Sequence, residues 1–241
     1  MEDIAPELYA KIEADFDKSV KGDTVIKQLV NKLNKGKPLS NGDFTTVASR
    51  LGKHASDAFH TYLTVDALPE GQMFWNIADR TVRPIMNKIY ETENGLQILS
   101  QHIKDKAAGV NISIVKGMDP VNRIDEVLDF AVNSKTGEEL YNALDLPVQT
   151  TALDFNDDFM RQNGEIRNEL GFEQTVIREY DGVGLGNGTR PCNWCIGRAG
   201  TWTFQEAKDN GVFERHTGCG CTIEIVSSDE VENDEIPDVP F

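Results

Sequence analysis

The stretch Cys192-Asn-Trp-Cys195, followed across one loop by His216-Thr-Gly-Cys219-Gly-Cys221, holds all four cysteines of the 241-residue chain. A C-x-x-C turn brings two thiolates together, and a second cluster of soft donors can complete a tetrahedron around a metal ion. This spacing predicts a small zinc-binding module. Its candidate ligands are Cys192, Cys195, His216, Cys219 and Cys221.

Five donors compete for four positions in a tetrahedral site. The run Cys221–Val226 alternates and is rich in β-branched residues, which predicts a strand and gives Cys221 a rigid base. On a regular strand Cys219 and Cys221 would share a face. Cys219 is flanked by glycines, so we favour Cys192, Cys195 and Cys221, with His216 as the fourth ligand in preference to Cys219.

A structural zinc is favoured over a catalytic zinc and over disulfides. A catalytic zinc keeps one position open beside a carboxylate, and neither Glu214 nor Glu224 stands in an H-E-x-x-H pattern. Two disulfides are the alternative, but the acidic N-terminus does not read as a secretory signal. We further expect Gly197 to let backbone amides reach the thiolates, and Trp194 and Trp202 to form an apolar wall.

Upstream of the module, apolar residues recur at a spacing typical of helices. Pro6, Asp23 and Ser40 or Asn41 are expected to begin three helices, because proline and short polar residues favour helix N-termini. Pro84 is expected to start or kink part of a later one. The further expected helices cover 74–89, 96–107, 123–133 and 154–170, and the stretch 111–115 is expected to be extended.

These patterns predict an α+β protein that is mainly α. We expect a mainly helical domain over 1–170, a zinc-binding module with short strands over 171–226, and an acidic, disordered tail over 227–241. The glycine-rich stretch 181–188 lacks the Lys-Ser/Thr of a phosphate-binding loop and is interpreted as an exposed loop tip.

The charge of the chain argues against nucleic-acid binding. The net charge is −16, and 171–226 holds five Lys/Arg against seven Asp/Glu, a net of −2. A module that reads DNA is normally basic, so direct sequence-specific DNA binding is not expected. No apolar run is long enough to span a bilayer, and no membrane partner is expected.

Three runs of the C-terminal third carry a family resemblance. Val176-Ile-Arg-Glu-Tyr-Asp-Gly182, Pro191-Cys-Asn-Trp-Cys-Ile-Gly197 and Val212-Phe-Glu-Arg-His-Thr-Gly-Cys-Gly-Cys221 resemble the C-terminal module of minor head proteins of tailed bacteriophages, the Mu F-like head morphogenesis group. The stretches 73–79, 83–84 and 157–163 are similar to the same group.

The resemblance implies a minor capsid protein that takes part in head morphogenesis, at the portal or in the capsid interior. It implies the phage portal or major capsid protein as partner, and the virion as final location after assembly in the host cytoplasm. It implies no demonstrated chemistry.

Two other functions stay open. One is a phage-encoded enzyme, a nuclease or an ADP-ribosyltransferase-like protein, that uses the zinc module as a scaffold; the other is a zinc adaptor that binds a protein. An enzyme needs a set of polar catalytic side chains, and no Ser-His-Asp or Cys-His set can be assembled from this sequence. Asp157 and Asp158 are interpreted as residues that flank a helix, and His54, His60 and His102 as surface or packing residues. We therefore expect no enzyme activity and name no catalytic residue.

Overall fold

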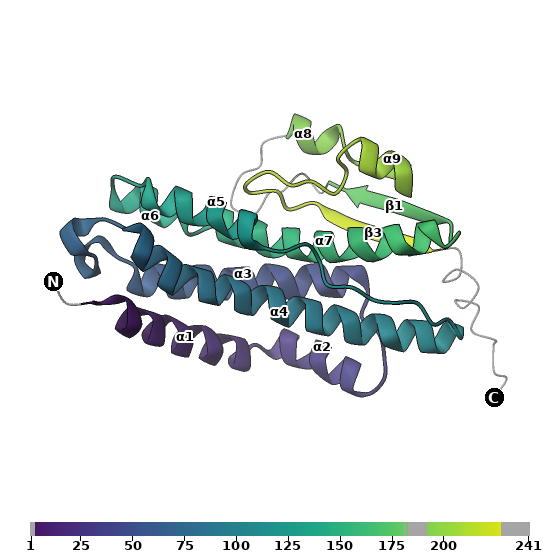
Figure 1. Cartoon of the computed structure of the whole chain (residues 1–241), viewed down its shortest axis with the longest axis horizontal. Coiled ribbons are helices and arrows are strands. Elements are labelled where there is room, and N and C mark those ends of the chain that lie inside the picture. The colour runs from purple at the N-terminus through teal and green to yellow at the C-terminus, as the bar shows by residue number, and fades with distance from the viewer. Residues whose placement is uncertain (1–2, 181, 183–191, 228–241) are drawn as a thin grey trace.

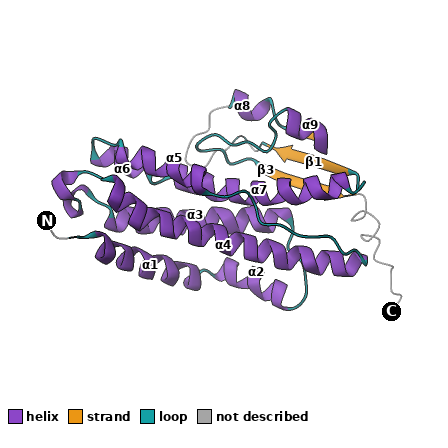
Figure 2. Ribbon diagram, viewed as in Figure 1, coloured by secondary structure: helices purple, strands orange, loops and turns teal. Residues whose placement is uncertain are grey.

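The computed structural model describes residues 3–180, 182 and 192–227. Stacked long helices form the body, and a small sheet with two short helices lies over α7, where β3 also contacts α3 (Figure 1). The prediction of a mainly α member of the α+β class is confirmed (Figure 2). Most of the glycine-rich loop and the predicted acidic tail beyond Ser227 lie outside the described residues.

The elements follow one another in a simple order. The helical body contains α1 Ala5–Gly22, α2 Thr24–Asn34, α3 Asn41–Tyr62, two 3₁₀ turns (Val65–Ala67 and Pro69–Gly71), α4 Trp75–Ala108, α5 Val121–Val132, α6 Gly137–Ala143 and α7 Leu146–Glu169. The module contains β1 Gln174–Glu179, α8 Asn193–Ile196, β2 Gly200–Thr203, α9 Phe204–Asp209 and β3 Thr222–Ser227.

The predicted helix starts are confirmed by their caps. The Asp23 carboxylate accepts from the backbone N–H groups of Val25 and Ile26 at 2.9 and 3.1 Å. Ser40 and Asp43 form a reciprocal capping box at the start of α3. Each cap satisfies amides that the first helical turn leaves without an internal partner.

The prediction of two helices over 74–89 and 96–107 is wrong, because α4 is continuous. Pro84 lies inside α4 and does not end it. The polar residues that interrupt the apolar pattern are buried: Asn94 accepts from the Gly117 amide at 2.7 Å, and Gln97 donates to Asn156 Oδ1 at 2.9 Å. Buried polar groups need such partners, and these two partners come from outside the helix.

α7 belongs to two cores. Its first half packs into the large apolar cluster of the body, through residues such as Val148, Ala152 and Phe155. Met160 belongs instead to the cluster of the module, with Val176, Phe204 and Ile223. α7 therefore joins the two cores. α3 also supports the module, because β3 packs against it and Asn41 Nδ2 donates to the Ile225 carbonyl at 3.3 Å.

The sheet is antiparallel, with strand order β2-β1-β3. Val176 in the central strand pairs with Trp202 on one side and with Ile225 on the other. β3 begins at Thr222, so Cys219 and Cys221 precede the strand. The expectation that the two cysteines share a face of a regular strand is therefore wrong. Trp202 packs with the core of the sheet rather than beside the cysteines, which corrects its predicted role.

Gly164 on α7 sets how closely the module approaches the body. A Cβ at this position would lie 2.5 Å from Cε2 of the buried Phe204 and 3.0 Å from Gln174 Oε1. We expect Gly164→Ala to lower the free energy of unfolding by about 1–3 kcal/mol, as overpacking does. Gly95→Ala on α4 is the control: its Cβ would meet nothing within 4 Å, and we expect it to be neutral or stabilising. Urea unfolding checks both, and equal stability of the two variants would contradict the close packing.

None of the described helices combines the length and the apolar character that crossing a bilayer requires.

Candidate metal centre

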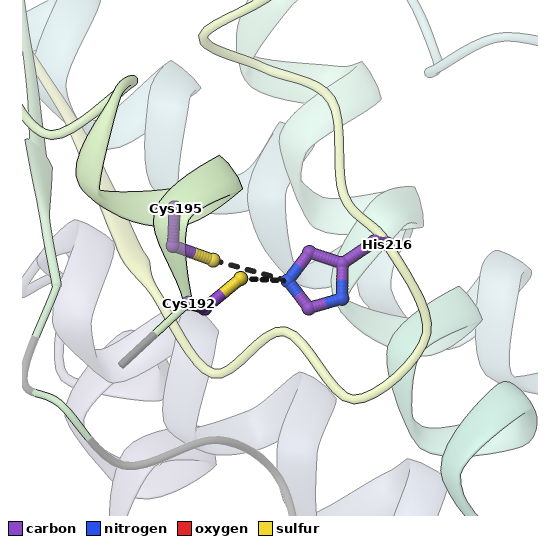
Figure 3. A group of neighbouring side chains, drawn as sticks. All are labelled: Cys192, Cys195 and His216. Atoms are coloured by element: carbon purple, nitrogen blue, oxygen red, sulfur yellow. Dashed lines mark hydrogen bonds between the residues drawn. The ribbon is translucent and has the colours of Figure 1, made fainter. Parts of the chain in front are cut away.

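The five predicted ligands come together from two segments of the module. Cys192 caps α8 and Cys195 lies within it, whereas the other three lie in the loop between α9 and β3. Figure 3 shows His216 pointing its ring toward the sulfurs of Cys192 and Cys195. Cys195, Cys219 and Cys221 are each no more than 2% exposed.

The donors form two groups that share Cys195. The ligand atoms of Cys192, Cys195 and His216 lie within 4.8 Å of one another, as do those of Cys195, Cys219 and Cys221. His216 Nε2 lies 3.1 Å from both Cys192 Sγ and Cys195 Sγ, and Cys195 Sγ lies 3.7 Å from Cys219 Sγ. In a tetrahedral site with zinc–sulfur bonds of about 2.3 Å, sulfurs lie about 3.8 Å apart. The donor set therefore has the composition and spacing of a metal site.

The tautomer of His216 suits a ligand. Its Nδ1 lies 2.9 Å from the backbone carbonyl of Thr217, and a carbonyl can only accept. Nδ1 is therefore the donor in this contact, which leaves Nε2, the nitrogen beside the two sulfurs, as the ligand atom. A hydrogen bond that fixes the second ring nitrogen in this way is a common feature of metal-binding histidines.

Arg178 indicates that the cluster is negatively charged. This side chain, 1% exposed, points inward from β1 and donates to the carbonyl oxygens of Val212 and Glu214 and to Cys219 Sγ, the last at 3.3 Å. Among the described residues it forms no ion pair with a carboxylate. Asp157 interacts with this cation electrostatically but already pairs with Arg215, and the only ionisable acceptor among the hydrogen bonds of Arg178 is the thiol of Cys219. Thiolates held by a metal would supply negative charge beside Arg178.

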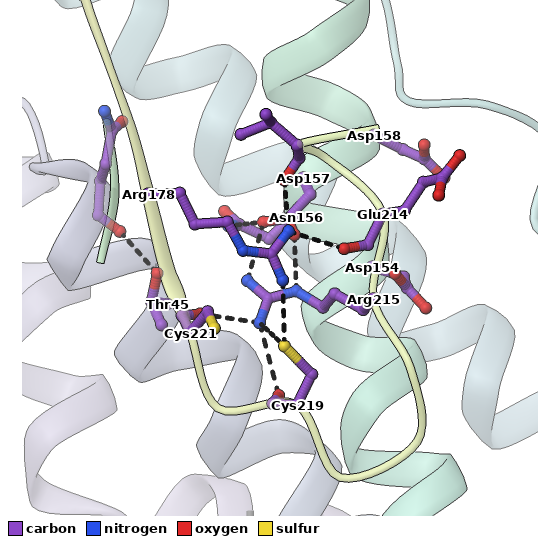
Figure 4. A network of polar contacts seen from close by, with 12 residues as sticks. Thr45, Asp154, Asn156, Asp157, Asp158, Arg178, Glu214, Arg215, Cys219 and Cys221 are labelled. Atoms are coloured by element: carbon purple, nitrogen blue, oxygen red, sulfur yellow. Dashed lines mark hydrogen bonds and ion pairs between the residues drawn. The ribbon is translucent and has the colours of Figure 1, made fainter. Parts of the chain in front are cut away.

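A second buried arginine joins the ligand loop to the helical body. Arg215 donates from Nε and Nη2 to the Asp157 carboxylate on α7, at 2.5 and 3.1 Å, and from Nη1 to the Cys221 carbonyl at 2.8 Å (Figure 4). Both side chains are almost fully buried. The Gly218 amide adds a hydrogen bond of 2.8 Å to Thr150 Oγ1 on the same helix. The loop is thus fastened to α7 at several points.

The thiols differ in their readiness to ionise. A hydrogen bond from Cys221 lowers the pKa of Cys219 to about 4, and the nearby Arg215 acts in the same direction against the effect of burial. Burial raises the pKa of Cys195 to about 11. A bound cation would favour the thiolate form of both. The preference for Cys221 over Cys219 as a ligand stays a prediction.

All four cysteines are free thiols, so neither disulfide of the alternative is present. Trp194 lies against the cluster, as expected, with its ring centroid 5.2 Å from that of His216. The expectation for Gly197 is wrong: its amide donates to the Asn193 carbonyl within the α8 turn.

The sequence did not single out Arg178, Arg215 or Asp157 as part of the site. Asp157 does not merely flank a helix but lies in the interior of α7 and is buried. One signal was available: Arg178 follows Val176 by two residues, so it shares the inward face of the strand. A charged residue on a buried strand face requires a partner in the interior.

Comparisons with protein-family models, with curated proteins and with solved structures gave no match.

Proposed function

We propose that this chain is a minor head protein of a tailed bacteriophage, in which a structural zinc ion shapes the C-terminal module for assembly at the portal or capsid interior. The observation that carries the proposal is the C-x-x-C…H-x-x-C-x-C pattern of 192–221, whose five donors converge on one cluster. The soft donor set of four cysteines and one histidine favours zinc over oxygen-preferring ions such as magnesium.

The burial of the donors supports a structural role for the metal. A catalytic zinc leaves one position accessible to substrate, whereas three of these cysteines are almost fully buried. When bound, the ion supplies a cross-link between α8 and the loop before β3. The residues around it orient the loop: Arg215 fastens it to α7, and Arg178 balances its charge.

The enzyme alternative has one observation in its favour. Burial, followed by repulsion from Asp157, raises the pKa of Asp154 to about 8 against the effect of Arg123, and perturbed carboxyls cluster at active sites. However, Asp154 pairs with Arg123 at 3.1 Å, as structural networks also do. The head-protein proposal therefore stands first.

The test is proteomic. We expect mass spectrometry of purified phage particles from a strain that encodes the chain to find it in the head fraction. We also expect the tagged chain to recover the portal or the major capsid protein from the lysate, beside an unrelated bait of equal negative charge. Purified chain should leave duplex DNA uncut and unshifted at low salt, because counterion release requires cationic contacts. Absence from particles together with tight DNA binding would overturn the proposal.

A further inference from the structure

An open hollow of about 650 Å³ lies where α5, α6 and the start of α7 meet the ligand loop. Its apolar lining includes Phe130, Ala143, Leu146 and Pro147. Thr217, between the candidate ligand His216 and the anchored Gly218, lines it from the module. The volume lies in the range of binding pockets, which is about 300–1,000 Å³.

One aromatic side chain of the lining, Phe130, is largely exposed to solvent. Phe130 is 53% exposed, although the same helix buries Ile124, Val127, Leu128 and Ala131 in the core. A large exposed aromatic ring beside an apolar hollow is typical of an interaction site. Among the described residues nothing covers this ring.

The surroundings of the hollow are acidic. Asp129 and Glu139 belong to its lining, and the segment 119–145 holds seven Asp/Glu against two Lys/Arg, a net charge of −5. This negative electrostatic field disfavours the binding of a second copy of the chain, whose own net charge is −16. It favours a partner whose apolar anchor is flanked by cations.

We propose that this hollow, the α5–α6 groove, binds a protein segment that inserts apolar side chains and places Lys or Arg beside Asp129 and Glu139. This inference deepens the proposed function. It rests on that function in one respect, namely that the partner is a head protein. A helix with an apolar stripe and a basic face fits such a groove, since its anchors repeat along one side. The ligand loop then forms one wall of the groove, with Thr217 as its contact residue.

Two defined peptides test the groove on the purified chain. The first is a fluorescein-labelled helical peptide of about 15 residues with Phe and Leu on one face and Lys elsewhere, and the second carries Glu in place of Lys. We expect fluorescence anisotropy to show salt-sensitive binding of the lysine peptide alone. Phe130→Ser and Asp129→Lys should each weaken it about tenfold or more.

Matched variants control for hydrophobicity and charge. Leu99→Ser removes a leucine that is 44% exposed on α4, and Glu7→Lys reverses an exposed charge on α1; neither residue lines the groove. Both should bind the lysine peptide as the unaltered chain does. Equal binding of the two peptides would overturn the proposed binding site. So would groove variants that lose no more affinity for the lysine peptide than the controls do. Neither result depends on whether the chain is found in phage particles, so the two proposals can fail separately.

Discussion

Replacing Cys195 by serine is expected to unfold the module over 174–227 while α1, α3 and α4 stay folded. Cys195 belongs to both groups of donors, so its loss damages any set of four ligands. The module has few buried apolar residues of its own besides the cysteines. A structural zinc contributes on the order of 10 kcal/mol or more to such a fold, which exceeds what a core of this size supplies.

Hydrogen exchange followed by mass spectrometry measures this effect directly. In Cys195→Ser, and in the unaltered chain after chelation, we expect the amides of β1 and β3 to lose protection. Amides of α3 and α4 should keep theirs, because the large apolar cluster of the body does not include the module. His102→Ala is the control, since this exposed histidine lies outside the cluster. Full protection of β1 and β3 after both treatments would contradict a structural metal.

The second large effect is expected at the ion pair between Arg215 and Asp157. Leaving one partner of a buried pair without the other costs about 3–5 kcal/mol. Burial, followed by repulsion from Asp157, raises the pKa of the neighbouring Glu93 well above its usual range, so Glu93 is a poor replacement for Asp157 as counterion. We therefore expect Arg215→Met and Asp157→Leu each to lower the free energy of unfolding by about this amount.

A double-mutant cycle separates the pair from its surroundings. The double variant should lose much less stability than the two single variants together, because it leaves no buried charge without a partner. Lys11→Met is the control, since it removes the exposed pair with Glu7 and should cost about 1 kcal/mol or less. Urea unfolding, monitored by a spectroscopic signal from the sheet, provides the free energies of unfolding for the cycle. Additive single effects would show that the two side chains do not act as a pair.

The sequence predicted those parts of the fold that depend on local chemistry. Asp23 and Ser40 began helices as expected, because a cap involves neighbours in the chain. The five donors converged because a C-x-x-C turn and a C-x-C segment already bring cysteines close together. The continuity of α4 was missed, because the contacts that Asn94 and Gln97 make outside the helix are with residues distant in sequence.

The parts around the metal cluster could not be predicted for the same reason. Asp157 meets Arg215 across 58 residues, and Arg178 meets Cys219 across 41. No periodicity connects such pairs: the strand alternation places Arg178 on the inward face but does not identify its partner. α9 was also missed, although its capping box of Thr203 and Glu206 is a local signal.

Native mass spectrometry of the purified, unreduced chain tests the central claim most directly. It reports in one spectrum whether the chain carries a metal and whether its thiols are oxidised. We predict the mass of the chain with one zinc ion, returning to the fully reduced mass after acid denaturation, because zinc holds the cysteines as thiolates. A metal-free chain whose mass corresponds to two disulfides would contradict the account.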